Sequence, residues 1–205
     1  MPADRHVRAK FSAETIVVYQ AYASPIADAA LAAGTFVTPF KRERMTWIKP
    51  SFLWMMYRSG WATKPGQERI LAVEMTRTGF EWALANASLS HYDRDAHESA
   101  AAWAAEKRAS PVRVQWDPER SITLQPLTYR AIQIGLSGEA VTRYVEDWIR
   151  GITDVTRTAT DIRRLLTAGD LDAAQAALPG ERPYPLPEPA RRRTAASENE
   201  HDRPR

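Results

Sequence analysis

The sequence predicts an α+β fold, in which a mixed or antiparallel sheet core carries short helices and is closed by a C-terminal helical subdomain. Two observations predict this class. Segments typical of strands are interspersed with short helical segments along the first 136 residues, and helical patterns follow one another from about residue 138. A hydrophobic fraction of 44% and seven Trp residues provide enough apolar surface for a core.

The length of 205 residues favours a single domain with a tail. We predict one α+β domain over residues 1–185, which includes the C-terminal helices. Residues 186–205 are rich in Pro, charged and small residues and have almost nothing to bury. The sequence therefore predicts a disordered tail there.

The chain opens with a strand, a short loop and a helix. Residues Thr15–Tyr19 are β-branched and continuous, which is typical of a buried strand. Ser24 and Pro25 follow as an N-cap and a proline at the first helical position. The helix after them ends at Gly34, where glycine readily adopts the left-handed conformation.

The next elements are again a helix, a strand and a helix. Pro50 begins a helix over residues 51–59, and Arg69–Met75 is predicted to be a strand. Thr78–Ala87 is a short helix with Thr78 as its cap. Leu89–Ser110 is polar and is predicted to be an excursion from the core.

Three strands and three helices complete the predicted fold. Val112–Trp116 alternates apolar and polar residues and ends in a turn at Asp117-Pro118. The two following strands are Ile122–Leu127 and Tyr129–Leu136. The predicted helices are residues 138–151, capped by Ser137, then Val155–Thr167 and Leu171–Leu178.

Residues 39–64, which we call the basic aromatic segment, are the most informative part of the chain. Cations suit phosphates and aromatic faces suit flat rings, so this mixture predicts a ligand-binding face. A helix that begins at Pro50 beside these cations also favours an anion. The cations are Lys41, Arg42, Arg44, Lys49, Arg58 and Lys64, and the aromatics within them are Trp47, Phe52, Trp54, Tyr57 and Trp61.

Each residue of this segment also has a structural interpretation. The basic residues can form a solvated loop, with Glu43 pairing locally. Trp54 is expected in the core, whereas Trp47 is a candidate for ring stacking on a ligand. Arg58 near the end of its helix is expected to complement the helix dipole.

A second candidate surface is the polar face of the strand that begins at Val112. Arg113 and Gln115 point to one side of it, opposite two valines. Such a face can be merely solvent-exposed. If it lines a cleft, Gln115 can hydrogen-bond a ribose or an amide, and Asp117 or Glu119 can act as a general base or stabilise a developing cation.

Composition excludes several function classes. The chain has no Cys, which excludes disulfides and thiolate chemistry. His91 and His97 lie in a polar loop without a recognised metal spacing, and we predict no metal. There is no P-loop and no Rossmann glycine motif.

The net charge of +3 with a pI near 9.3 is only mildly basic. No apolar run is long enough for a membrane span and no hydrophobic signal core is present, so we expect a cytoplasmic protein with no membrane partner.

Several motifs resemble a family known as domain of unknown function 4291, and the resemblance runs from about Val17 to Leu178. The motifs are VYQAY, IADAALAAG, PFKRERMTWIKPSFLWMMYRSGW, VQWDPER, RAIQIGLSGEA and ITDVT.

The opening IVVYQAYASPIADAALAAGTF resembles, more distantly, ADP-ribosyltransferase-like domains. In those domains a strand ending in Tyr-His-Gly-Thr precedes a helix that ends in a Gly-Phe step. This chain keeps Tyr19 and has Gly34 with Phe36, but Gln20-Ala21-Tyr22 stands in the place of His-Gly-Thr. The resemblance implies NAD as the cofactor and a late acidic residue, for which Asp117 and Glu119 are the candidates.

We therefore expect a nucleotide-binding enzyme, similar to the NAD-dependent ADP-ribosyltransferases, that acts on a nucleic-acid or protein acceptor. Glu119 and Asp117 are its candidate catalytic residues. The predicted ligand-binding residues are Tyr19, Gln20, Arg44, Trp47, Lys49, Ser51 and Gln115. The alternative is a non-enzymatic RNA- or DNA-binding domain that uses the basic aromatic segment, and a third interpretation is a protein-interaction module.

Overall fold

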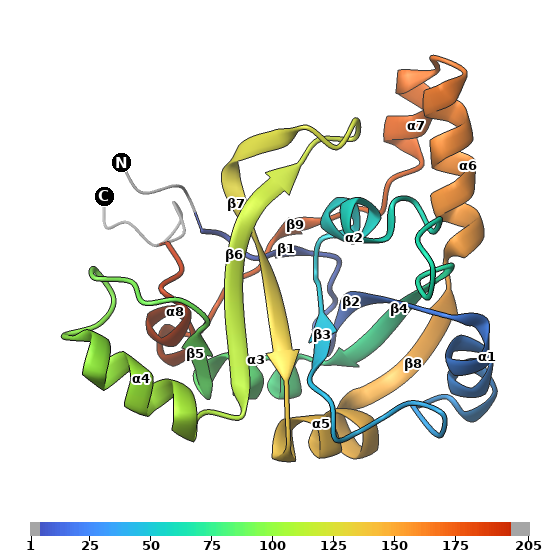
Figure 1. Ribbon diagram of the computed structural model, residues 1–205. Helices are drawn as coiled ribbons and strands as arrows, with labels where there is room; N and C mark the ends of the chain where they lie inside the picture. The colour runs from blue at the N-terminus through green and yellow to red at the C-terminus, as the bar shows by residue number, and fades with distance from the viewer. Residues whose placement is uncertain (1–4, 198–205) are drawn as a thin grey trace.

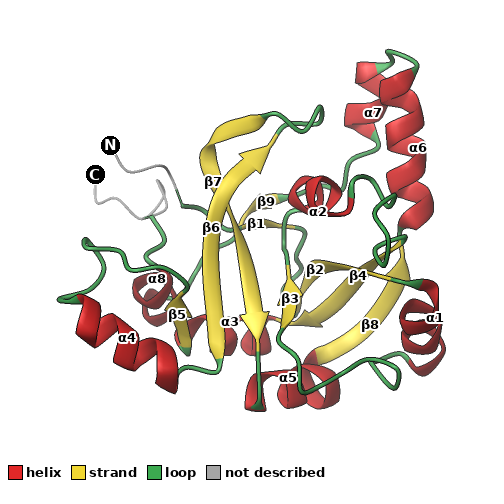
Figure 2. Ribbon diagram, viewed as in Figure 1, coloured by secondary structure: helices red, strands yellow, loops and turns green. Residues whose placement is uncertain are grey.

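The computed structural model describes residues 5–197 and has the predicted α+β class (Figures 1 and 2). Its strands are β1 Arg8–Ala9, β2 Thr15–Tyr22, β3 Thr46–Ile48, β4 Arg69–Thr76, β5 Ala87–Leu89, β6 Val112–Arg120, β7 Pro126–Leu136, β8 Ile149–Asp154 and β9 Arg182–Pro183. Its helices are α1 Ser24–Ala33, α2 Phe52–Ser59, α3 Arg77–Ala85, α4 Ala100–Ala109, α5 Glu139–Arg143 with the π-helical turn η1 Tyr144–Trp148, α6 Thr156–Thr167, α7 Leu171–Ala176 and α8 Glu188–Thr194.

Three sheets organise these strands. One has the order β2-β4-β8 and is antiparallel, a second has the order β3-β7-β6-β5, and β1 pairs with β9. In the four-stranded sheet only the β5–β6 pair is parallel. The two larger sheets meet where Tyr19 of β2 bridges Lys49, the residue directly after β3 (Figure 1). This single bridge leaves the sheets free to diverge on either side of it.

Two apolar cores hold the sheets and helices together. The larger one lies between both sheets, α1, α3, α5 and α8, and its largest buried side chains include Phe36, Phe80 and Tyr144. A smaller core joins α2 to α6 and α7, with Phe52 and Ile162 fully buried in it. Among the helices of residues 5–197, none has both the length and the apolar character needed to cross a membrane.

The first elements form largely for the reasons that the sequence suggests, but Ser24 is the first residue of α1 and not its N-cap, which is Ala23 without a side-chain hydrogen bond. Helix α1 has Pro25 in its first turn and ends at Gly34, whose φ of 70° lies in the left-handed region. Helix α2 ends in the same way at Gly60. Its N-cap is Ser51, whose Oγ accepts a hydrogen bond from the backbone N–H of Trp54.

Two predicted boundaries in the middle of the chain are wrong, and the strand predicted over Ile122–Leu127 is instead a turn that leads into β7 at Pro126. The cap of α3 is Thr76 rather than Thr78, because the Thr76 hydroxyl accepts from the backbone N–H of Gly79. Strand β6 does not end at Asp117-Pro118 but continues to Arg120, because Asp117 and Pro118 still pair with β7. A register shift between Pro118 and Arg120 shows a β-bulge there.

The region from Ser137 to Asp154 also differs from the prediction of one long helix. Ser137 donates its hydroxyl to the Pro111 carbonyl instead of capping a helix, and the cap position belongs to Gly138. After α5 and η1, residues Ile149–Asp154 become strand β8 on the edge of β4. The sequence IRGITD contains Gly and three β-branched residues, which explains why this stretch leaves the helix.

The predicted disordered tail contains an ordered helix. Helix α8 packs on α3 and β5, and Ala190 and Thr194 are buried. The indole Nε1 of Trp116 donates to the Thr194 carbonyl at 2.7 Å. Sequence composition missed this helix because only its two small residues are buried. Residues 198–205 of the predicted tail lie outside the described residues.

The two ends of the described chain lie side by side. Strands β1 and β9 pair, so residues 8–9 lie against residues 182–183. The backbone N–H of Arg5 donates to Ser197 Oγ at 3.0 Å, and the backbone N–H of Ser197 donates to the Arg5 carbonyl at 3.0 Å. We call these contacts the terminal seam.

We predict that helix α8 contributes to stability. A chain ending at Pro185 should melt at a lower temperature than a chain ending at Ser197, because the shorter one exposes the surface that Ala190 and Thr194 cover. Both variants lack residues 198–205, so the comparison isolates residues 186–197. Equal melting temperatures in a calorimetric scan would show that α8 adds nothing to the fold.

Candidate functional site

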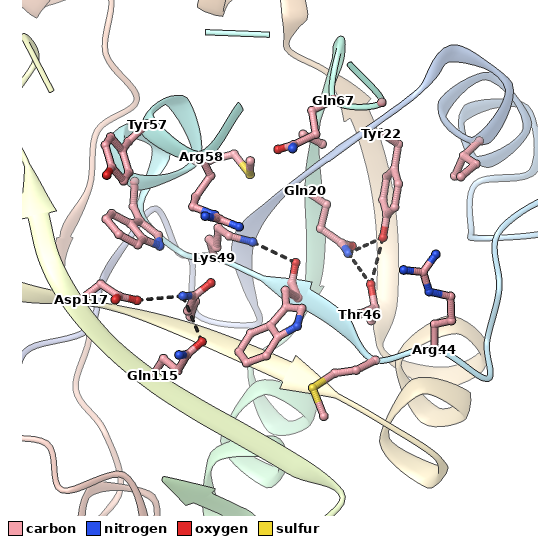
Figure 3. Close-up of a pocket in the computed structure, with 18 of the residues that line it drawn as sticks. Gln20, Tyr22, Arg44, Thr46, Lys49, Tyr57, Arg58, Gln67, Gln115 and Asp117 are labelled. Carbon is pink, nitrogen blue, oxygen red and sulfur yellow. Dashed lines mark hydrogen bonds between the residues drawn. The ribbon is translucent and has the colours of Figure 1, made fainter. Parts of the chain in front are cut away.

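A cleft of about 960 Å³ opens between the two larger sheets, beside the bridge that joins them. Side chains from β2, the loop before β3, α2, β6 and β7 point into it (Figure 3). Its polar and aromatic lining is Gln20, Tyr22, Phe40, Lys41, Arg44, Thr46, Trp47, Lys49, Trp54, Tyr57, Arg58, Gln67, Gln115, Asp117, Arg120 and Gln133. This volume is in the range of small-molecule binding sites.

Charge in this cleft is strongly unbalanced. Five cations line it, namely Lys41, Arg44, Lys49, Arg58 and Arg120, against the single carboxylate of Asp117. Within residues 5–197, none of these five cations forms an ion pair. A set of unneutralised cations around one concavity attracts anions.

Lys49 is the most perturbed of these cations. It is only 6% exposed, and its Nζ lies 3.4 Å from the Trp47 carbonyl oxygen. Burial, with a further contribution from the positive charge of Arg58, lowers the pKa of Lys49 to about 7, although Asp117 acts in the opposite direction. A substantial fraction of Lys49 is therefore a neutral amine near neutral pH.

Asp117 is held in place by amides from the adjacent strand. The Nε2 of Gln133 donates to Asp117 Oδ2 at 2.8 Å and also lies 3.2 Å from Gln115 Oε1. Gln115 and Gln133 are directly opposite one another in the β6–β7 register. The carboxylate is thus oriented by the sheet and remains on the cleft wall, since Asp117 lines the cavity.

A hydroxyl network forms the β2 side of the cleft (Figure 3). The Nε2 of Gln20 donates to Tyr22 Oη at 2.8 Å and to Thr46 Oγ1 at 2.7 Å, while these two hydroxyls lie 2.9 Å apart. The buried Tyr144 hydroxyl donates to Gln20 Oε1 at 2.8 Å and fixes the amide orientation.

The hydrogen bonds of this network leave one hydroxyl hydrogen of the Tyr22–Thr46 pair without an acceptor among the described residues. Both amide hydrogens of Gln20 are used, and one hydroxyl hydrogen fills the bond between Tyr22 and Thr46. The other hydroxyl hydrogen has no acceptor among the contacts of the described residues. Burial raises the pKa of Tyr22 to about 12, so its hydroxyl stays protonated. The network therefore offers one donor to a ligand acceptor in the cleft.

The aromatic residues of the cleft divide into two groups. Trp54 is buried and stacks on Tyr57 with ring centroids 5.1 Å apart, and the Arg120 guanidinium lies 3.7 Å from the Tyr57 centroid. Trp54 was expected in the core; it is buried, but it forms a wall of the cleft together with Tyr57. Trp47 is half-buried and lies over Gly135, where an added Cβ would come within 3.0 Å of the indole. The absence of a side chain at Gly135 therefore makes room for the Trp47 indole on the cleft wall.

The cleft brings together six of the nine predicted site residues. Gln20, Arg44, Trp47, Lys49, Gln115 and Asp117 line it, whereas Tyr19, Ser51 and Glu119 do not. The Tyr19 side chain packs in the smaller core against Phe52. It contributes to the site only through its backbone bridge to Lys49.

Glu119 and Ser51 lie in a second cavity of about 340 Å³. The β-bulge after Pro118 turns the side chains of β6 over, so Arg120 reaches the main cleft, although it borders the second cavity too. Glu119 is 5% exposed and accepts from the Ser51 hydroxyl at 3.0 Å and from the Arg120 backbone N–H at 2.8 Å. It belongs to the support of helix α2.

A second acidic residue completes that support. Glu181 accepts from the backbone N–H of Phe52 at 2.7 Å, at the start of α2. Burial, together with the negative charge of Glu119, raises the pKa of Glu181 to about 8. Glu119 and Glu181 lie in the same cavity, close enough for their charges to repel one another, and Glu181 is largely protonated at neutral pH.

Sequence reasoning missed several members of the cleft. Tyr22 and Thr46 sit beside predicted residues, but their pairing through Gln20 depends on how β2 and β3 approach one another. Gln133 was missed because the β6–β7 register cannot be seen in the sequence. Arg58 lies in the last turn of α2, where the prediction of a dipole partner put it, and it also lines the cleft.

The low pKa of Lys49 predicts a specific dependence of stability on pH. Between pH 7 and the ordinary value of 10.5, the unfolded chain binds a proton that the folded chain has released. The free energy of unfolding should therefore rise with pH there, with a limiting slope of about 1.4 kcal/mol per pH unit for one proton. Lys49→Met should lose this component, whereas Lys41→Met, on an exposed residue, should keep it. Denaturant titrations of wild type and variants at several pH values measure the difference. A constant offset between wild type and Lys49→Met across this range would contradict the prediction.

Comparison with known proteins places the chain in one family. No curated protein and no solved structure matches it significantly. A family model described as domain of unknown function (DUF4291) matches residues 6–184. This range covers both large sheets, the cleft and helices α1 to α7. The protein is therefore a member of the DUF4291 family.

Proposed function

We propose that the cleft binds NAD and that the protein is an enzyme similar to the ADP-ribosyltransferases, which cleaves the bond between nicotinamide and ribose. The observation that carries the proposal is the set of five cations without ion pairs among residues 5–197, gathered around one carboxylate. A pyrophosphate supplies the negative charge that this arrangement lacks.

Arginine is the preferred residue for the phosphate role. Arg44 approaches from the loop before β3 and Arg58 from α2, so the two guanidinium groups enter the cleft from different elements (Figure 3). Each can donate two hydrogen bonds to a phosphate in its fork geometry. Lys41 adds a mobile charge at the rim, where it is exposed.

The rings and the amide of NAD have matching partners. Trp47 offers a half-exposed indole face for stacking on a base or a pyridinium ring. The free hydroxyl hydrogen of the Tyr22–Thr46 pair suits a carboxamide or base oxygen. These contacts replace those that the His-Gly-Thr residues make in the family that the opening segment resembles.

We assign to Asp117 the stabilisation of the positive charge that develops on the ribose, and we no longer propose Glu119 as a catalytic residue. Cleavage of the glycosidic bond builds positive charge on the ribose, and a carboxylate near the anomeric carbon stabilises it. Asp117 is the one carboxylate that lines the cleft, and Gln133 holds it in place. The Glu119 carboxylate is engaged by Ser51 and the Arg120 backbone in the second cavity.

The acceptor of the ADP-ribose unit is proposed to be a nucleic acid or a protein. Exposed residues of the loop 41–44 continue the positive charge of the cleft onto the surface, which favours a nucleic acid. Binding of RNA or DNA without any turnover of NAD is the alternative function. The expected cytoplasmic location also stays a prediction.

The proposal predicts that NAD stabilises the protein and is slowly consumed. NAD should raise the melting temperature, because a ligand that binds only the folded state shifts unfolding by mass action. Asp117→Asn should abolish nicotinamide release with little loss of NAD binding, because this carboxylate acts mainly in the transition state. Melting scans with and without NAD and chromatography of nicotinamide measure both effects.

Glu119→Gln is the matched control in this experiment. It removes a charge from the second cavity and should lower stability while retaining nicotinamide release. Absence of both a thermal shift and nicotinamide at millimolar NAD would refute the proposed function. Binding of a short RNA or DNA with a steep dependence on salt would then favour the nucleic-acid alternative.

A further inference from the structure

Lys49 does not behave as one more phosphate-binding cation. Of the four other cations that line the same cleft, Lys41, Arg44 and Arg58 are exposed and can contact phosphates. The fourth, Arg120, lies against the Tyr57 ring in the cleft wall. Lys49 is instead buried. Within the described structure its Nζ has the Trp47 carbonyl as its one hydrogen-bond partner and no carboxylate at ion-pair distance. Such a site favours the uncharged amine, which is a nucleophile and not an anion receptor.

The backbone of Lys49 is also unusually well fixed. Its N–H donates to the Tyr19 carbonyl at 3.2 Å and its carbonyl accepts from the Tyr19 N–H at 2.7 Å. The next residue is Pro50, which restricts Lys49 to an extended conformation. A reactive side chain held from both sides in this way is preorganised in the cleft.

The surrounding charges suit an amine that reacts. Arg58 of α2 repels the ammonium form, and Asp117 of β6 faces the same cleft and can take up a proton. Arg44 and Arg120 line the cleft as well and supply positive charge for the phosphates of a substrate. Nucleophile, proton acceptor and phosphate-binding groups therefore share one cavity.

We infer that Lys49 is a nucleophile that forms a covalent bond with the anomeric carbon of a phosphorylated ribose in this cleft. The inference rests on the proposed function in that NAD is the first substrate considered. The same chemistry applies to ADP-ribose, whose sugar ring opens to an aldehyde.

With NAD, the lone pair of Lys49 Nζ attacks C1′ of the nicotinamide ribose. The Nζ–C1′ bond forms as the bond from C1′ to nicotinamide breaks, and its electron pair returns to the pyridinium ring, so nicotinamide leaves as a neutral molecule. The proton lost by the amine passes to Asp117. Opening of the ribose ring then gives a protonated imine at C1′: the nitrogen lone pair forms the C=N bond, the bond from C1′ to the ring oxygen breaks, and Asp117 returns its proton to that oxygen. Addition of water or another acceptor at C1′ releases the sugar and restores the amine.

With ADP-ribose, the amine and the open-chain aldehyde form the same imine with loss of one water molecule. Cyanoborohydride supplies a hydride that reduces the imine to a stable secondary amine. The covalent intermediate can therefore be trapped and located from either substrate.

The experiment incubates the full chain with NAD or with ADP-ribose and cyanoborohydride, then measures intact mass and maps the modified peptide. Nicotinamide is measured in parallel. We expect one ADP-ribosyl unit per chain on Lys49 with both substrates, none in Lys49→Arg, and an unchanged yield in Lys10→Arg, because the exposed Lys10 side chain does not line the cleft. The yield should rise with pH through about 7, the pKa of Lys49, rather than near the ordinary lysine value.

The outcomes separate this inference from the proposed function. Nicotinamide release without an adduct on Lys49 overturns the inference and leaves the NAD reaction standing. An adduct from ADP-ribose without nicotinamide release from NAD supports Lys49 as the nucleophile and refutes NAD as the substrate. Adducts spread over Lys10, Lys41, Lys64 and Lys107 as much as Lys49 would overturn the inference, and this result is read from the wild-type protein whether or not a variant folds.

Discussion

The fold and the site both depend on the backbone bridge between Tyr19 and Lys49. Two hydrogen bonds, of 2.7 and 3.2 Å, are the connection between strand β2 of one sheet and the residue after β3 of the other. On one side of the bridge the apolar cores close. On the other side the sheets part, and the cleft is the space between them. The bridge thereby sets Gln20 and Lys49 on neighbouring strands at the base of the cleft.

Buried polar groups at this junction are satisfied unequally. Gln20 has its amide fully engaged by Tyr22, Thr46 and Tyr144, so it stiffens the β2 side of the cleft. Lys49 has one long contact to a carbonyl and no countercharge at ion-pair distance among residues 5–197. Burial of an amine with so few partners costs folding free energy, whereas the amide of Gln20 is fully hydrogen-bonded. The hydrogen-bonding capacity that Lys49 leaves unused lies in the cleft, where a ligand enters.

Sequence patterns predicted much of the fold and the general position of the site. Strand alternation put Gln115 on the polar face of its strand, and Gln115 lines the cleft together with many of residues 39–64, which were chosen for their density of cations and aromatics. The alternation failed at Glu119, because one bulge reverses the side to which the next residues point. Composition failed at α8, because Ala and Thr carry little hydrophobic signal although Ala190 and Thr194 are buried. The pairing of Gln133 with Asp117 follows from strand register, which no local pattern encodes.

The terminal seam gives the domain a mechanical property. Because β1 pairs with β9 and Arg5 contacts Ser197, hydrogen bonds join the first and last described residues of the chain. A force that pulls the two ends apart acts on these few hydrogen bonds first and must open them before it reaches the cores. The cleft lies between the two larger sheets, and no residue of the seam lines it. A load carried through a protein fused to either end would therefore peel the seam while the binding site kept its shape.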